Sequence, residues 1–140
     1  MAFIIIPGPQ GRPLTFNPVQ INYIHVKPDV MSVDLYGEGA KGAMSTNPAV
    51  IADFLAKILP LTYFLDLRTS NEGTVVNMSA IREVDYIDKA KIINIYFNNV
   101  KSHITIPWIY KTALEDALAN FNFSVGGGGT GARWMRRRGI

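Results

Sequence analysis

The chain repeats its own hydrophobic pattern at an offset of 60 residues, and this repeat constrains the fold more than any other feature. Asn17 then falls on Asn77, and Phe3-Ile4-Ile5 falls on Tyr63-Phe64-Leu65. Further positions agree along the strands: Ile21 on Ile81, Ile24 on Val84, Val33 on Ile93, Leu35 on Ile95, Tyr36 on Tyr96, Lys41 on Lys101 and Met44 on Ile104. Near each unit's end the offset falls to 59, with Leu55 on Leu114. The repeat predicts two structural units, at residues 1–60 and 61–121.

Each unit combines short strands with one helix at its end. Residues 21–26 and 31–36 alternate as strands do, and so do residues 81–87 and 92–97. Asn47 and Pro48 are typical of a helix start. The apolar helical faces are Val50, Ile51, Phe54, Leu55, Ile58 and Leu59, and then Ile109, Leu114, Leu118 and Phe121 after Pro107. We therefore expect an α+β fold of two tandem ββββα units, each a four-stranded antiparallel meander covered by its helix, packed as a pseudo-twofold pair.

Two tandem ββββα units resemble the Whirly and Pur-alpha type of single-stranded nucleic-acid-binding fold over residues 1–121. Lys41-Gly42-Ala43-Met44 is similar to part of a lysine- and glycine-containing stretch of Whirly proteins. The second unit has Lys101-Ser102-His103-Ile104 there instead. The resemblance implies a single-stranded nucleic acid as ligand, with Lys41 among the contacting residues.

Composition and motifs indicate a non-enzymatic protein without a cofactor or metal. The chain has no cysteine, which excludes disulfides and thiolate sites. Residues 126–129 are four glycines without the strand, lysine and helix of a phosphate-binding loop. His25 and His103 have no partners at metal-ligand spacing, and we interpret them as strand surface residues. The apolar run at the N-terminus is too short for a signal peptide or a membrane span.

Positive charge is concentrated at the end of the chain. The net charge is +3, but residues 126–140 hold four arginines and no acid. Without these four, 10 of the 14 basic residues remain, against 11 acidic residues, which gives a net charge of −1. We interpret residues 122–132 as a glycine-rich linker and residues 133–140 as a tail whose binding residues are Arg133, Trp134, Arg136, Arg137 and Arg138. Such a tail suits nucleic acid or an acidic protein groove, and a merely solubilising role leaves Trp134 without a purpose.

The second unit holds the other candidate binding residues. Four of its cations are candidates: Arg82, Lys89, Lys91 and Lys101. The strand tyrosines of both units, Tyr23, Tyr36, Tyr86 and Tyr96, could join them on an open sheet face. Trp108 follows Pro107 at a strand-to-helix corner, where packing is the favoured role and base stacking the alternative.

These features predict a nucleic-acid-binding protein. It would bind single-stranded DNA or RNA through a sheet face and an arginine-rich tail. The alternative is a structural or assembly protein, such as a phage virion or ring component, whose tail docks on a neighbouring subunit. An enzyme is the least favoured class. We expect a homo-oligomer, no membrane partner, and a location in the cytoplasm or in a virion.

Overall fold

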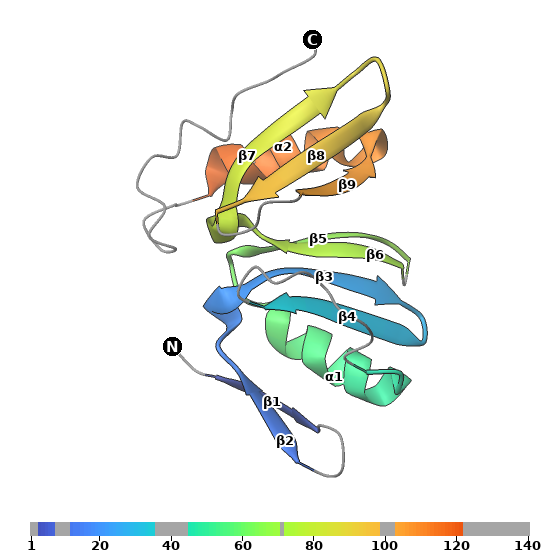
Figure 1. Ribbon diagram of the computed structural model, residues 1–140, viewed down its shortest axis with the longest axis vertical. Coiled ribbons are helices and arrows are strands. Elements are labelled where there is room, and N and C mark those ends of the chain that lie inside the picture. Colours follow the sequence, from blue (N-terminus) through green and yellow to red (C-terminus); the bar gives the residue numbers. More distant parts are fainter. Residues whose placement is uncertain (1–2, 8–11, 36–44, 71, 99–102, 122–140) are drawn as a thin grey trace.

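The computed structural model describes residues 3–7, 12–35, 45–70, 72–98 and 103–121. The first half contains strands β1 (Ile4–Pro7), β2 (Pro13–Phe16), β3 (Ile21–Lys27) and β4 (Val30–Leu35) and helix α1 (Pro48–Ile58). The second half contains strands β5 (Phe64–Thr69), β6 (Glu72–Asn77), β7 (Ile81–Ile87), β8 (Ile92–Phe97) and β9 (His103–Pro107) and helix α2 (Lys111–Asn120). The elements form an elongated stack, with β1 and β2 at one end and β7 at the other (Figure 1).

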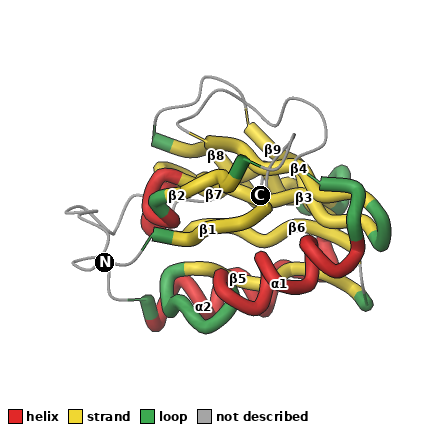
Figure 2. Tube along the Cα trace, turned by 90° about the horizontal axis from the view of Figure 1, so that it is seen from below, coloured by secondary structure: helices red, strands yellow, loops and turns green. Residues whose placement is uncertain are grey.

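The strands form antiparallel sheets, so the α+β class is confirmed, but the grouping of strands differs from the prediction. The sheets have the orders β1-β2, β4-β3-β6-β5 and β7-β8-β9. The expected four-stranded meander within each unit is therefore wrong, because the β5–β6 hairpin of the second half pairs through β6 with β3 of the first half. Figure 2 shows both helices on one side of the strands.

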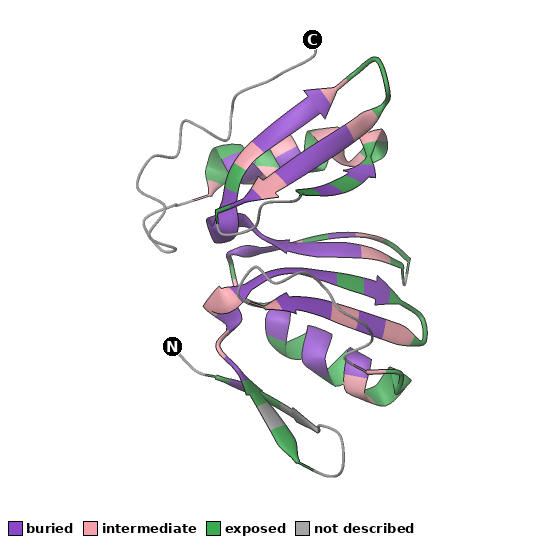
Figure 3. Cartoon of the chain, viewed as in Figure 1, coloured by how far each residue is buried: buried purple, intermediate pink, exposed green. Residues whose placement is uncertain are grey.

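The shared hairpin joins two hydrophobic cores. Phe64 and Val75 point into the core under α1, whereas Leu67 and Val76 belong to the core under α2. Successive strand residues face opposite sides, so one hairpin contributes to both cores. Figure 3 shows that buried residues recur along the central strands, between intermediate and exposed ones, and that the β1–β2 hairpin is more exposed.

The recurring asparagine has the same structural task in both halves. The Asn17 Oδ1 accepts a hydrogen bond from the Val19 amide at 3.2 Å, and the Asn77 Oδ1 accepts one from the Ser79 amide at 3.0 Å. Each bond caps a short 3₁₀ turn that leads into the next strand. Asn77 also donates from Nδ2 to the Ile21 carbonyl at 2.9 Å, which ties the two halves together.

The 60-residue offset holds up to the tight turn that follows β3 and β7, and it changes after that turn. Lys27 pairs with Val30 across the first tight turn, whereas Ile87 pairs with Ile92 across the second, so the second turn is longer. Val33 pairs with Ile24 and Ile95 with Val84, and the predicted match of Val33 with Ile93 is therefore wrong by two residues. Just before α1, Ser45 forms an isolated antiparallel bridge with Met31 of β4.

The helices follow the prediction at their cores and depart from it at one start. Asn47 caps α1 by accepting a hydrogen bond from the Ala49 amide at 2.9 Å, and Pro48 is the first helical residue. In the second half Pro107 ends β9, and a 3₁₀ turn over Trp108–Tyr110 precedes α2. Leu114 and Leu118 are buried as expected, but Ile109 is 74% exposed and does not face inward.

Candidate nucleic-acid interface

A corner of the second half collects two lysines around one indole ring. The Lys91 ammonium lies 5.2 Å from the centre of the Trp108 ring, and the Lys111 ammonium lies 5.7 Å from it. Trp108 is only half-buried and packs against the core from its edge, next to the exposed Ile109. The corner thus places two ammonium groups, one paired with Asp88 and the other with Glu115, beside a partly accessible aromatic ring. A phosphate would compete with those carboxylates for the lysines, while the ring suits a base.

The longer β7–β8 turn brings Lys91 to this corner. Lys91 has a φ of 56°, a left-handed conformation that glycine or asparagine ordinarily supplies. Its amide donates to the Asp88 carbonyl at 3.2 Å, and its ammonium pairs with the Asp88 carboxylate. Holding a lysine here costs about 1–2 kcal/mol of backbone strain. A lysine at a strained backbone position, beside an aromatic ring, is a candidate functional residue.

A second cation–aromatic group lies at the opposite end of β7. The Arg82 guanidinium is 5.6 Å from the centre of the Tyr96 ring, and the Tyr96 and His103 rings are 4.9 Å apart. Arg82 occupies an irregularity where the β7–β8 register shifts between Ile81 and Glu83, so its side chain is exposed. Among the described residues, Arg82 forms no ion pair.

Acidic and amide side chains occupy the sheet face between these two groups. Glu83 is opposite Tyr96, and Asp85 is opposite Asn94, which accepts a hydrogen bond from Thr105 at 2.7 Å. Asp85 is buried. The centre of this face therefore repels phosphate, and any contact with an anion is confined to the two ends.

The structure places only part of the predicted site together. Lys91 and Trp108 meet, Arg82 lies on Tyr96, and Lys89 is exposed in the longer turn. The expected open face of tyrosines is wrong for Tyr23 and Tyr86, which are buried in the core. Outside the described residues lie Tyr36 and the predicted site residues Lys41, Lys101, Arg133, Trp134, Arg136, Arg137 and Arg138.

Sequence reasoning missed Lys111 and His103. Lys111 lies 5.8 Å from the Tyr86 ring centre in addition to its contact with Trp108, and it pairs with Glu115 at 2.8 Å. Its position three residues after Trp108, at the start of a helix, is a signal that could have found it. His103 was assigned to the strand surface, and its contact with Tyr96 depends on pairing between β8 and β9.

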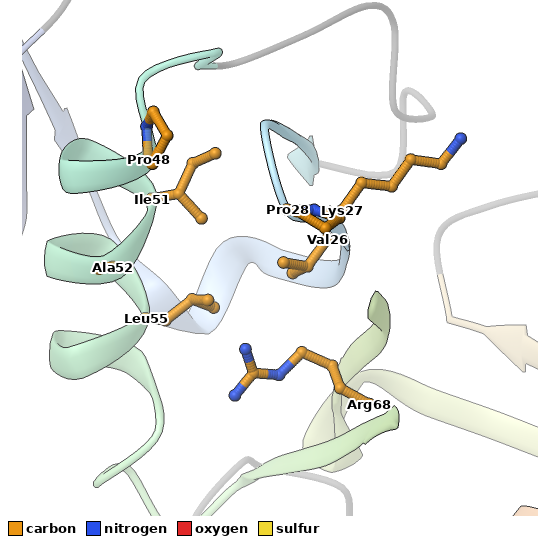
Figure 4. Close-up of a pocket in the computed structure, with 8 residues that line it drawn as sticks. All are labelled: Val26, Lys27, Pro28, Pro48, Ile51, Ala52, Leu55 and Arg68. Carbon is orange, nitrogen blue, oxygen red and sulfur yellow. The ribbon is translucent and has the colours of Figure 1, made fainter. Parts of the chain in front are cut away.

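A cleft beside α1 is a weaker candidate. It has a volume of about 170 Å³ and is lined by Val26, Lys27, Pro28, Pro48, Ile51, Ala52, Leu55 and Arg68. Figure 4 shows Arg68 reaching toward Leu55 while the Lys27 chain extends away. The Arg68 guanidinium is already held by both oxygens of Asp66, at 2.8 and 2.9 Å. The cleft thus offers little free positive charge.

The titratable groups of the described part of the chain do not form a metal-ligand cluster. No group of three His, Asp or Glu side chains there could hold a metal ion. His25 contacts the Thr74 hydroxyl at 3.2 Å, and burial lowers the pKa of its imidazole although Asp34 acts in the opposite direction. No described helix is long and apolar enough to cross a membrane.

Comparison with known proteins supports a different fold relationship from the one expected. No protein-family model and no curated protein sequence matches the chain. A solved structure, the LytTr DNA-binding domain of a putative methyl-accepting/DNA response regulator from Bacillus cereus, matches with a TM-score of 0.59. The two are 14% identical, and the match covers 86% of this chain and 99% of that one. The fold is therefore LytTr-like, and the expected Whirly or Pur-alpha resemblance is wrong.

Proposed function

We propose that the chain binds nucleic acid through the basic ends of its β7-β8-β9 sheet. The observation that carries this proposal is the corner where Lys91 and Lys111 both approach the Trp108 ring. Ammonium groups contact phosphates, and a partly exposed indole offers a surface to a base or a sugar. The similarity of the fold to a domain described as DNA-binding supports the same class of ligand.

Arg82 extends the proposed surface at the far end of β7. It is exposed and its guanidinium lies 5.6 Å from the centre of the Tyr96 ring, so its N–H groups can still donate to a phosphate. The acids between the two ends make a continuous sheet-face contact unfavourable. The proposed footprint is therefore two separated phosphate contacts rather than one stacked row of bases.

The four arginines of residues 133–140 add electrostatic affinity in this proposal. Each contacted phosphate releases bound counterions, so the tail strengthens binding most at low salt. We propose a single strand as the preferred ligand, because Trp108 and Trp134 are suited to unpaired bases.

Competition binding tests both the class of ligand and the strand preference. A labelled single-stranded DNA of 20 nucleotides is bound at low salt and displaced with unlabelled single strand, its duplex, or RNA of the same sequence. The proposal predicts displacement by all three, with the single strands at least about tenfold better than the duplex. Preference for the duplex would overturn the single-strand proposal alone. No binding at low salt would overturn the proposed function.

A further inference from the structure

Two strands at opposite ends of the molecule have an open edge. Among the described residues, β7 pairs only with β8 and β2 pairs only with β1. An open edge presents unpaired amide and carbonyl groups that can accept another strand. Figure 1 places the β1–β2 hairpin at one end of the long axis and β7 at the other.

A pairing within the chain, between β6 and β3, shows how the open edges of β2 and β7 could pair. The strand β2 leads through the Asn17-capped turn into β3, and β6 leads through the Asn77-capped turn into β7. The strands β2 and β6 are thus corresponding elements, and so are β3 and β7. In the observed sheet, β6 pairs with β3 of the preceding half. The corresponding contact for the open edges joins β2 of one copy to β7 of another.

An exposed phenylalanine marks the surface that this contact would cover. Phe16 pairs with Ile4, while Val76, which corresponds to Phe16, pairs with Leu65. Ile4 therefore corresponds to Leu65, and Phe3 corresponds to Phe64. Phe64 is 6% exposed because it enters the core of the preceding half, whereas Phe3 is 59% exposed.

We propose that the β1–β2 hairpin docks on β7 of a second copy of this chain, so that copies associate head to tail. Transferring the observed β3–β6 register predicts the pairs Phe16–Glu83, Thr15–Val84, Leu14–Asp85 and Pro13–Tyr86. Pro13 cannot donate a ladder hydrogen bond, so this seam is shorter than the internal one. The contact uses different surfaces of the two copies and therefore generates a ring or a filament.

Charge at the seam fits the same register. Arg12, one residue before β2, falls opposite Ile87 and diagonal to Asp85. Diagonal neighbours across antiparallel strands are within reach of a long side chain. One oxygen of the buried Asp85 carboxylate has no hydrogen-bond partner in the described chain, and a guanidinium arriving from β2 would satisfy it.

The absence of cysteine allows a direct test by disulfide trapping. One protein carries Arg12→Cys, a second carries Ile87→Cys, and the two are mixed under mild oxidation. Opposed residues of antiparallel strands have Cα separations of about 4.5–5.5 Å, which a disulfide spans. The proposal predicts a mixed disulfide dimer that forms at least about tenfold faster than either homodimer. A partner carrying His103→Cys, on the exposed edge strand β9, serves as the control and should cross-link slowly.

Exposed substitutions separate docking from folding. Phe3→Asp on the Arg12→Cys protein should slow cross-linking at least about tenfold, since the docked phenylalanine loses an apolar site. Ile109→Asp, at a residue that is even more exposed, should leave the rate unchanged. Sedimentation velocity of the unmodified chain should show association that Phe3→Asp removes. Equal rates for mixed and like pairs, or a chain that stays monomeric at every concentration, would overturn the proposal.

Discussion

The Lys91 ammonium lies 5.2 Å from the centre of the Trp108 ring, although its own backbone holds a φ of 56°. Replacing Lys91 with glycine removes the charge and relieves the left-handed backbone. We predict that Lys91→Gly raises the free energy of unfolding, measured by urea denaturation, by about 1 kcal/mol. The same variant should bind nucleic acid more weakly. Lys89→Gly is the control, since it removes a charge from the same turn without the Trp108 contact. If the Lys91→Gly and Lys89→Gly proteins bind nucleic acid equally tightly, Lys91 does not belong to the interface.

The two tryptophans can report separately on the corner and the tail. Trp134→Phe leaves Trp108 as the single indole, and Trp108→Phe leaves Trp134. If the corner contacts nucleic acid, the emission of the Trp134→Phe protein changes on titration with an oligonucleotide and saturates with the binding curve. An emission that stays constant while anisotropy reports binding would place the ligand away from Trp108.

Asn77 should matter more to stability than the corresponding Asn17. Asn77 is fully buried and bonds the Ser79 amide as well as the Val19 and Ile21 carbonyls of the first half. Asn77→Ala removes all of these bonds from a buried site, and we expect a loss of about 3 kcal/mol in the free energy of unfolding. Asn17→Ala removes a single described cap bond and should cost about 1 kcal/mol. Equal losses in urea denaturation would contradict the linking role of Asn77.

The β5–β6 hairpin offers two opposite backbone effects. Gly73 has a φ of 145°, and an added Cβ would lie 2.8 Å from the Arg68 Cα and from the Leu67 carbonyl oxygen. We expect Gly73→Ala to destabilise the fold by about 1–3 kcal/mol. Ser70, in the turn of this hairpin, has a φ of 59°, so Ser70→Gly should be neutral or stabilising. Thermal unfolding of both variants measures the contrast, which a tolerated Gly73→Ala would refute.

Acid should weaken the fold partly through Asp66. Hydrogen bonds from Arg68 hold the pKa of the Asp66 carboxyl below its usual value of 3.8. A lowered native pKa means that the unfolded chain binds the proton more readily. This contribution is therefore present above about pH 4 and is lost as the pH falls below it, and it is small because the pair is partly exposed. Arg68→Met should return the Asp66 pKa toward 3.8 in an NMR titration, and an unchanged pKa would exclude Arg68 as the cause.

Local structure was predictable because short-range chemistry decides it. Asn47 with Pro48 fixed the start of α1, and the recurring Asn17 and Asn77 marked two capped turns. Strand pairing between distant segments was not predictable in the same way. Val75 and Val76 carry the same apolar character, and only the assembled sheets show that one faces each core. The β5–β6 hairpin was therefore assigned to the wrong sheet.

The candidate site was predictable in its residue types and only partly in its geometry. Cations concentrated in the second half indicated Arg82 and Lys91, and the aromatic residue at the corner indicated Trp108. Lys111 was missed because its approach to Trp108 depends on the 3₁₀ turn between β9 and α2. Tyr86 was misplaced because a strand pattern with apolar residues on both faces does not show which face α2 covers.

The salt dependence of nucleic-acid binding tests the central claim most directly. Anisotropy titrations with single-stranded DNA compare the full chain, a truncation ending at Ser124, and a full chain carrying Arg82→Gln, Lys91→Gln and Lys111→Gln. The slope of the logarithm of the binding constant against the logarithm of the salt concentration is negative. We predict that truncation reduces its magnitude by about 3, as expected for the loss of four phosphate contacts, and that the truncated chain still binds. The triple variant should lose at least about tenfold in affinity, whereas Lys27→Gln with Lys57→Gln, at exposed residues away from the proposed interface, should lose little. Equal affinity of the two substituted chains, or no binding by the full chain at low salt, would contradict the account.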